Sequence, residues 1–176
     1  MEELYHAALE VSGEERAALL ARSDPEIRRS VEILLAQGSS GGAVRFDYCF
    51  LGRAYEQKGR LPEAIATFQR GLTLEGNTEL WSGLGHAYAA SGNKAEAQKV
   101  LDHLKELSTH SYVAPYNVAV IYVGLGEKDE AFAWLNRAYE ERSYILAEYL
   151  TTDARLDTLH SDPRFAELVR RIGLPQ

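Results

Sequence analysis

The sequence predicts an all-α protein built from stacked helical hairpins. One pattern occurs three times at an interval of 33 or 34 residues, in copies that cover residues 45–77, 78–111 and 112–145. Each copy carries apolar residues at three- and four-residue spacing on both sides of a glycine turn, which is the pattern of two amphipathic helices. A fixed period of this length is typical of proteins in which each repeat is one supersecondary unit stacked on the next.

Matching positions in the copies keep the same kind of side chain. In the first copy they are Tyr48, Leu51, Gly52, Tyr55, Gly59, Ala64 and Phe68, and in the second Trp81, Leu84, Gly85, Tyr88, Gly92, Ala97 and Leu101. The third copy continues with Val118, Ala119, Tyr122, Gly126, Ala131 and Leu135, whereas Pro115 stands where the opening aromatic is expected. The small alanine in each copy lets two helices cross closely, and the large residues fill the space around that crossing.

These positions resemble the tetratricopeptide repeat, whose pattern is an aromatic, Leu-Gly and Tyr, followed later by Ala and a bulky residue. The first two copies match this pattern closely, and the third matches from Val118 onward. The proline near the end of the family's repeat is absent, with Gly76 and Thr109 at that position of the first two copies. The resemblance implies a right-handed superhelical stack of three hairpins that binds proteins and has no catalytic function.

Residues 1–37 are predicted to form a separate N-terminal helical unit. Ser12 with Glu15, and Ser23 with Glu26, have the spacing of a capping box, so a helix is expected to start at each. The segment also resembles the leader that precedes the catalytic domain in some bacterial serine/threonine protein kinases that carry such repeats. That resemblance implies a bacterial signalling context, although no kinase domain follows the segment here.

Residues 38–44 are predicted to be a flexible linker because of their glycine and serine content. The GSSGG run at 38–42 is a natural linker, a deletion scar or an engineered junction. It is not a phosphate-binding loop, since Ala43, Val44 and Arg45 follow the last glycine in place of Lys and Ser or Thr.

Residues 146–176 are predicted to form a C-terminal helical cap. Asp162 and Pro163 indicate the start of a helix, and Gly173 indicates its end. Stacked repeats leave an apolar end, so a terminal cap that covers it is the physical expectation.

Composition and charge exclude several classes of partner. There are 19 Lys and Arg against 26 Asp and Glu, a net charge of −7, so nucleic acid is not an expected partner. The single cysteine, Cys49, excludes a disulfide framework and favours a reducing, cytoplasmic location. Residues 1–22 lack the pattern of a secretion signal, and the longest apolar run, residues 113–126, is shorter than the roughly 17 residues of a membrane span. We therefore expect no membrane association.

No motif predicts catalysis, a metal or a cofactor. The glycine-rich loop, HRD and DFG motifs of a protein kinase are absent from the sequence. The five histidines are scattered, and adjacent acidic pairs such as Glu140 and Glu141 point into solvent in different directions. We expect no catalytic residue, no metal ligand and no cofactor.

The candidate binding residues follow from the resemblance, because the first helix of each hairpin in this family lines the concave surface. They are Phe46, Cys49, Arg53, Glu56, Glu79, Ser82, His86, Ala89, Val113, Tyr116, Val120 and Val123. Such surfaces hold an extended peptide or a partner helix. The family's two-carboxylate clamp is not expected, since Cys49 and Arg53 stand where Lys and Asn are needed.

The first helix of the third copy is apolar nearly all round, which is typical of a helix buried on every side. Its apolar face can be covered by the tail after Ser143, by a second copy of the chain, or by an apolar partner segment. The main functional hypothesis is an adaptor or scaffold that binds a protein or peptide in its groove. The alternative is a self-assembling module that forms a homodimer through this face.

Overall fold

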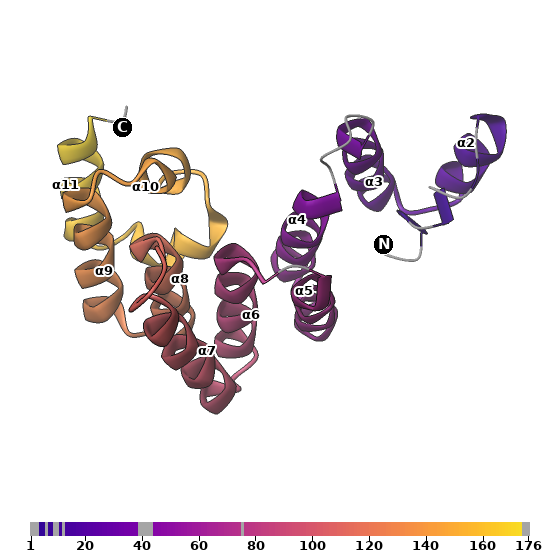
Figure 1. The fold of residues 1–176 in the computed structure, drawn as a ribbon. Coiled ribbons are helices and arrows are strands. Elements are labelled where there is room, and N and C mark those ends of the chain that lie inside the picture. The colour runs from indigo at the N-terminus through magenta and orange to yellow at the C-terminus, as the bar shows by residue number, and fades with distance from the viewer. Residues whose placement is uncertain are drawn as a thin grey trace.

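The computed structural model describes residues 4–5, 7–8, 11, 13–38, 44–74 and 76–173, and the regular elements in these ranges are helical (Figure 1). The helices are α2 (Gly13–Ala21), α3 (Pro25–Gly38), α4 (Val44–Gln57), α5 (Leu61–Leu74), α6 (Thr78–Ala90), α7 (Lys94–Leu107), α8 (Pro115–Leu125), α9 (Lys128–Glu140), α10 (Tyr144–Tyr149), the 3-10 helix η1 (Ala154–Leu159) and α11 (Pro163–Ile172). None of the helices in these ranges is long and apolar enough to cross a bilayer.

Three helical hairpins form the centre of the chain, as the repeats predict. The pairs are α4 with α5, α6 with α7, and α8 with α9, and consecutive hairpins pack through α5 on α6 and through α6 on α8. The turn glycines Gly59, Gly92 and Gly126 have φ angles of 70°, 82° and 78°, a left-handed conformation that glycine adopts without steric cost. The predicted all-α stack of hairpins is confirmed.

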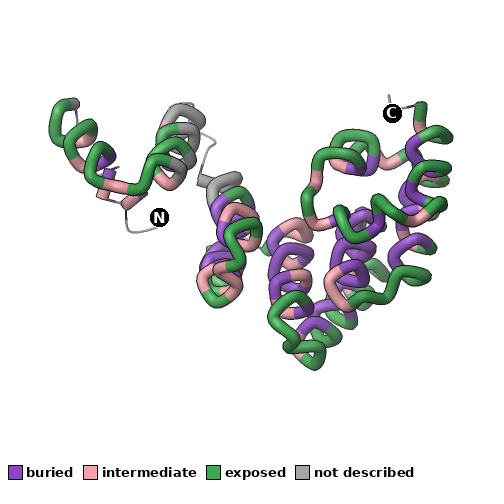
Figure 2. The backbone as a smooth tube through the Cα atoms, turned by 180° about the vertical axis from the view of Figure 1, so that it is seen from behind, coloured by how far each residue is buried: buried purple, intermediate pink, exposed green. Residues whose placement is uncertain are grey.

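The spacing between hairpins depends on residues that lack a large side chain. Ala64 and Ala97 are fully buried where the two helices of their hairpins cross. A Cβ atom on Gly52 or on Gly83 would lie 2.4 Å from the Phe68 ring, so that ring fills the space between the two glycines. Buried residues are concentrated in α6 and α8 in the middle of the stack (Figure 2).

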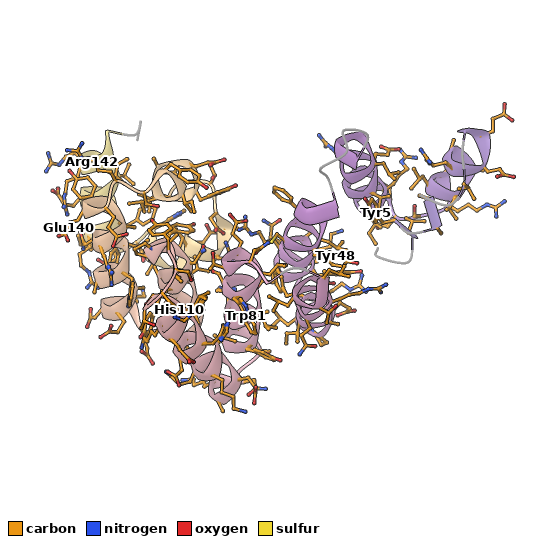
Figure 3. All side chains as sticks on the ribbon, in the orientation of Figure 1. Tyr5, Tyr48, Trp81, His110, Glu140 and Arg142 are labelled. Carbon is orange, nitrogen blue, oxygen red and sulfur yellow. The ribbon has the colours of Figure 1, made fainter. Side chains whose placement is uncertain are left out.

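The N-terminal helices α2 and α3 have a small core of their own. Its buried members are Tyr5, Ala8, Leu20 and Val31. Tyr5 lies well away from Trp81 in the repeat stack (Figure 3). Of the predicted linker, both ends are helical because α3 reaches Gly38 and α4 begins at Val44, and residues 39–43 lie outside the described ranges. The division into domains stays a prediction.

The segment after the third hairpin packs against two different parts of the stack. Helix α11 lies on α9, where the guanidinium groups of Arg164 and Arg171 stand 4.2 Å from the ring centres of Phe132 and Tyr139. The 3-10 helix η1 instead lies against α8 (Figure 1). The tail therefore covers the end of the stack and also reaches the first helix of the third repeat.

Candidate functional site

The first helices of the hairpins, α4, α6 and α8, carry the candidate binding residues. Arg53 and Glu56 come from α4, and Glu79 and His86 come from α6. Arg53, Glu79 and His86 remain half-buried and keep part of their surface in solvent. These residues are the polar part of the predicted concave surface.

The other candidates lie inside the protein, apart from Phe46, whose side chain is outside the described residues. The buried candidates are Cys49, Ser82, Ala89, Val113, Tyr116, Val120 and Val123. In this structure these side chains are core residues, and their role in partner binding stays a prediction. The candidates of the third repeat are buried because α6, α9 and η1 together pack around α8.

The tail covers the apolar helix of the third repeat. The Tyr116 hydroxyl donates a hydrogen bond of 2.9 Å to Oδ2 of Asp153, and the rings of Tyr116 and Tyr149 lie 6.4 Å apart. The Arg53 guanidinium lies 5.4 Å from the centre of the Tyr149 ring. The sequence left three candidates to cover the apolar face of this helix: the tail, a second copy of the chain or a partner segment. In the structure the tail after Ser143 packs against it.

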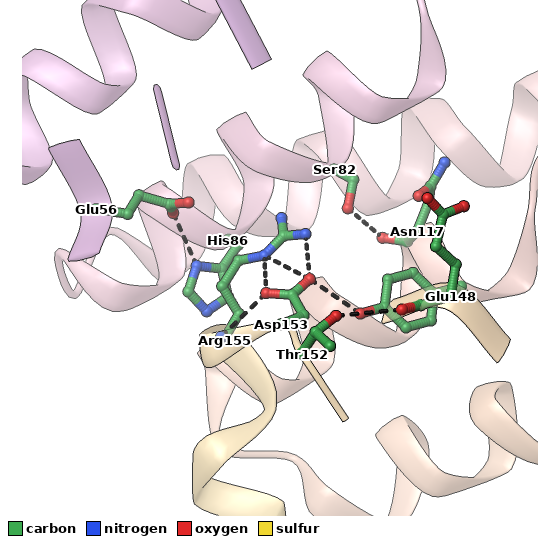
Figure 4. Close-up of polar contacts among 9 residues, drawn as sticks. Glu56, Ser82, His86, Asn117, Glu148, Thr152, Asp153 and Arg155 are labelled. Carbon is green, nitrogen blue, oxygen red and sulfur yellow. Dashed lines mark hydrogen bonds and ion pairs between the residues drawn. The ribbon is translucent and has the colours of Figure 1, made fainter. Parts of the chain in front are cut away.

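Asp153 and Arg155 form a buried ion pair at the point where the tail enters the stack (Figure 4). Arg155 donates from Nε and Nη2 to both carboxylate oxygens, at 2.6 to 3.1 Å, and its backbone N–H donates to Oδ1 at 3.1 Å. The two side chains are 7% and 6% exposed. A pair this deeply buried is stable only when its charges and hydrogen bonds are matched.

The ion pair and its burial shift the pKa values of the groups involved. Burial alone would raise the pKa of Asp153, but the hydrogen bonds and charge of Arg155 outweigh it and lower the pKa to about 2. Burial alone would lower the pKa of Arg155, yet Asp153 raises it above its ordinary value. Burial, followed by the Asp153 charge, raises the pKa of Tyr116. The carboxylate, guanidinium and neutral phenol are therefore the stable forms at neutral pH.

A second polar contact links the first two repeats. Oε1 of Glu56 on α4 lies 2.8 Å from Nδ1 of His86 on α6 (Figure 4). A pocket of about 130 Å³ opens beside this contact. Its lining residues are Arg53, Glu56, Gln57, His86, Asp153, Ala154 and Arg155. Residues of the first two repeats and of the tail therefore line one small pocket.

Cys49 and Ser82 have structural roles in the described chain. Burial, followed by the charge of Glu79, raises the pKa of the Cys49 thiol to about 12, so the reactive thiolate is disfavoured at neutral pH. The Ser82 hydroxyl donates a 2.8 Å hydrogen bond to the backbone oxygen of Asn117, which joins α6 to α8. Over the described residues, no group of three or more His, Cys, Asp or Glu side chains has the arrangement of a metal site.

Comparison with known proteins agrees with the repeat geometry. The Tetratricopeptide repeat family profile matches residues 48–78, 78–110 and 116–143, just over half of the chain. The chain belongs to the tetratricopeptide repeat family. Proteins of this family bind other proteins, and no enzyme family matches the chain. No solved structure gives a significant match.

Two curated relatives show the same repeat class in longer proteins. The chain is 28% identical to human Superkiller complex protein 3 over 111 residues, which is 62% of this chain and 7% of that protein. It is 33% identical to Superkiller protein 3 of Schizosaccharomyces pombe over 82 residues, which is 46% of this chain and 6% of that protein. The chain thus spans less than a tenth of the length of either relative.

The repeat pattern did not indicate the contribution of the tail to the groove. Tyr149, Asp153 and Arg155 lie beyond the third tetratricopeptide repeat, so no repeat register assigns them to a face. The available signal was an Asp and an Arg two residues apart in a segment otherwise expected to cap the stack. That signal is weak, because such pairs are common on protein surfaces.

Proposed function

We propose that this chain is a non-catalytic interaction module that binds an extended segment of a partner protein in the groove of its first two repeats. One observation supports the proposal above the others. A small pocket lies between α4, α6 and the tail, with half-buried Arg53 and His86 in its lining, whereas the equivalent face of α8 is filled by the chain's own tail. A partner segment therefore has a site in repeats one and two and finds repeat three already occupied.

The charge pattern of this groove favours a peptide that is neither strongly acidic nor strongly basic. Arg53 and Arg155 are balanced by Glu56 and Asp153 around the same pocket. Recognition then depends on hydrogen bonds and shape more than on net charge. This differs from a carboxylate clamp, which relies on an excess of cationic side chains.

Selection from a displayed random-peptide library against the purified chain tests the proposal. Peptides that bind in the groove should bind the Arg53→Glu variant at least about tenfold more weakly, because a buried or half-buried charge contact is worth more than about 1 kcal/mol. The matched control is Arg70→Glu, which makes the same charge change on an exposed position of α5. Selected peptides that bind the Arg53→Glu variant as tightly as the wild type would count against the groove.

The alternative, a homodimer through the third repeat, has less support. It requires an exposed apolar face, and Val113, Val120 and Val123 are at most 8% exposed because the chain itself covers them. Molar mass by light scattering across a dilution series checks this point. A mass of one chain at every concentration is the expected result.

A bacterial signalling context is a further part of the proposal and depends on the kinase-leader resemblance of residues 1–37. The two relatives described above are a human protein and a yeast protein, so they do not support a bacterial context. A cytoplasmic location is proposed on the single, buried Cys49. Fractionation of the host cells with an antibody against the chain tests the location.

A further inference from the structure

Two buried polar atoms at the groove pocket have no hydrogen-bond partner among the described residues. They are Oε2 of Glu56 and Nη1 of Arg155. The Glu56 side chain is 5% exposed and the Arg155 side chain is 6% exposed, and both line the same pocket. Buried polar groups are nearly always paired, so these two atoms can each take one further hydrogen bond, from water or from a ligand group.

The other polar atoms of the Glu56 and Arg155 side chains already have hydrogen-bond partners. Only Oε2 and Nη1 are left to bind a ligand. Oε1 of Glu56 contacts His86, and Nε and Nη2 of Arg155 bind Asp153. Each of these two lining residues therefore keeps one buried polar atom for a further partner, an acceptor on Glu56 and an N–H donor on Arg155. A matching group must donate one hydrogen bond and accept another.

The charge and the size of the pocket limit the range of possible ligands further. The ionised lining groups are two cations, Arg53 and Arg155, and two anions, Glu56 and Asp153, so the pocket has no net charge to offer an ionic group. The pocket is small, with a volume of about 130 Å³. That is enough for one small polar side chain or one peptide group and too little for a helix.

We propose that the pocket binds a carboxamide group of the partner peptide. The amide oxygen accepts from Nη1 of Arg155, and the amide N–H donates to Oε2 of Glu56. A carboxamide is neutral and carries both a donor and an acceptor, which matches the acceptor left on Glu56 and the donor left on Arg155. This assignment rests on the proposed groove-binding function and specifies its ligand chemistry.

Two sources of the amide are distinguished by blocked amino acids used as probes. N-acetyl-glutamine methylamide and N-acetyl-asparagine methylamide offer a side-chain carboxamide, whereas N-acetyl-alanine methylamide offers main-chain amides alone. Binding is followed by nuclear magnetic resonance on the isotope-labelled full chain, through the backbone signals of α4, α6 and η1. Selective shifts with the first two probes assign the site to Asn or Gln side chains. Equal shifts with all three assign it to the peptide backbone.

The carboxylate analogue N-acetyl-glutamate methylamide tests the hydrogen-bond pattern. It lacks the N–H that pairs with Glu56, so it should bind at least about tenfold more weakly than the glutamine probe. The Glu56→Gln variant places an N–H where the wild type has an acceptor, and the loss of one negative charge leaves the lining with a net charge of +1. The preference should then reverse, with the glutamate probe bound more tightly. The control Glu96→Gln, on α7 and outside this pocket, should keep the wild-type preference.

The reversed preference in Glu56→Gln is a gain of binding to the glutamate probe. A variant that is merely less stable would lose binding to both probes, so the test distinguishes the two cases. Failure of every probe to shift these signals would show that the pocket holds water only and would overturn the proposal. Unchanged preference in Glu56→Gln would do the same. Library-selected peptides that require Arg53 but tolerate Glu56→Gln would overturn the amide site while leaving the groove-binding function in place.

Discussion

Removing the Asp153 carboxylate should destabilise the whole repeat stack. Its two oxygens accept hydrogen bonds from Tyr116 and from three nitrogens of Arg155, and its side chain is 7% exposed. The fall in its pKa from 3.8 to about 2 corresponds to about 2 kcal/mol in favour of the charged form. The substitution Asp153→Ala also leaves the Arg155 guanidinium buried without its partner, and breaking a buried pair in this way costs about 3–5 kcal/mol.

Urea unfolding measures this loss. Fluorescence reports on Trp81 and Trp134, which both pack against the main core, and far-ultraviolet circular dichroism reports on the helices. With a urea dependence of about 2 kcal/mol per molar, a loss of about 4 kcal/mol lowers the midpoint by about 2 M. The matched control is Asp157→Ala in the 3-10 helix that Asp153 caps, where the carboxylate is 67% exposed and the expected change is within about 0.5 kcal/mol.

A second substitution separates the lost carboxylate from the stranded guanidinium. If the buried cation causes much of the loss, adding Arg155→Met to Asp153→Ala should recover stability relative to Asp153→Ala alone. The reasoning would be refuted by an Asp153→Ala protein within about 1 kcal/mol of the wild type, because a solvent-exposed pair contributes no more than that.

Three further outcomes are expected. The folded pKa of Asp153 lies below its ordinary 3.8, so its stabilisation is complete above that value and is lost as the pH falls toward 2. The stability gap between wild type and Asp153→Asn, from urea titrations at each pH, should therefore be constant from about pH 7 to 5 and shrink between about pH 4 and 2; a constant gap would contradict this. Val120→Glu should abolish cooperative thermal unfolding, because Val120 is 0% exposed and burying a carboxylate there is costly; a variant that still unfolds cooperatively near the wild-type temperature would contradict this. Gly83→Ala should cost about 1–3 kcal/mol in urea titration, because its Cβ would lie 2.4 Å from the Phe68 ring. Gly76→Ala, with no atom within 4 Å of the new Cβ, should change little.

The sequence predicted the fold because the information for a repeat hairpin is local. A turn glycine such as Gly92, a cap such as Asn93 and a small residue such as Ala97 each act within one or two turns of helix, and they recur at a fixed interval. Because the pattern occurs three times, the two regular copies made the third recognisable. Pro115 in place of its opening aromatic therefore did not obscure the repeat. The structure places Pro115 in the first turn of α8, where a proline is tolerated.

The candidate site was predictable only in part. Repeat register placed Glu56 and His86 on neighbouring first helices, and the structure brings them to 2.8 Å. The same register placed Tyr116 in the groove, but it could not show that Asp153 would fold back and bind its hydroxyl. That contact joins residues 37 positions apart and depends on the path of an irregular segment, which has no period to read.

The tail links the stability of the stack to partner binding. Asp153 and Arg155 hold η1 against α8, and the same two side chains line the pocket of the groove. A ligand that binds only when the tail is docked must stabilise the docked state, and by reciprocity the loss of docking must weaken the ligand. Peptides selected on the wild type should therefore raise the urea midpoint of the wild type more than that of Asp153→Ala. Equal stabilisation of both proteins would mean that the groove binds its partner without the tail.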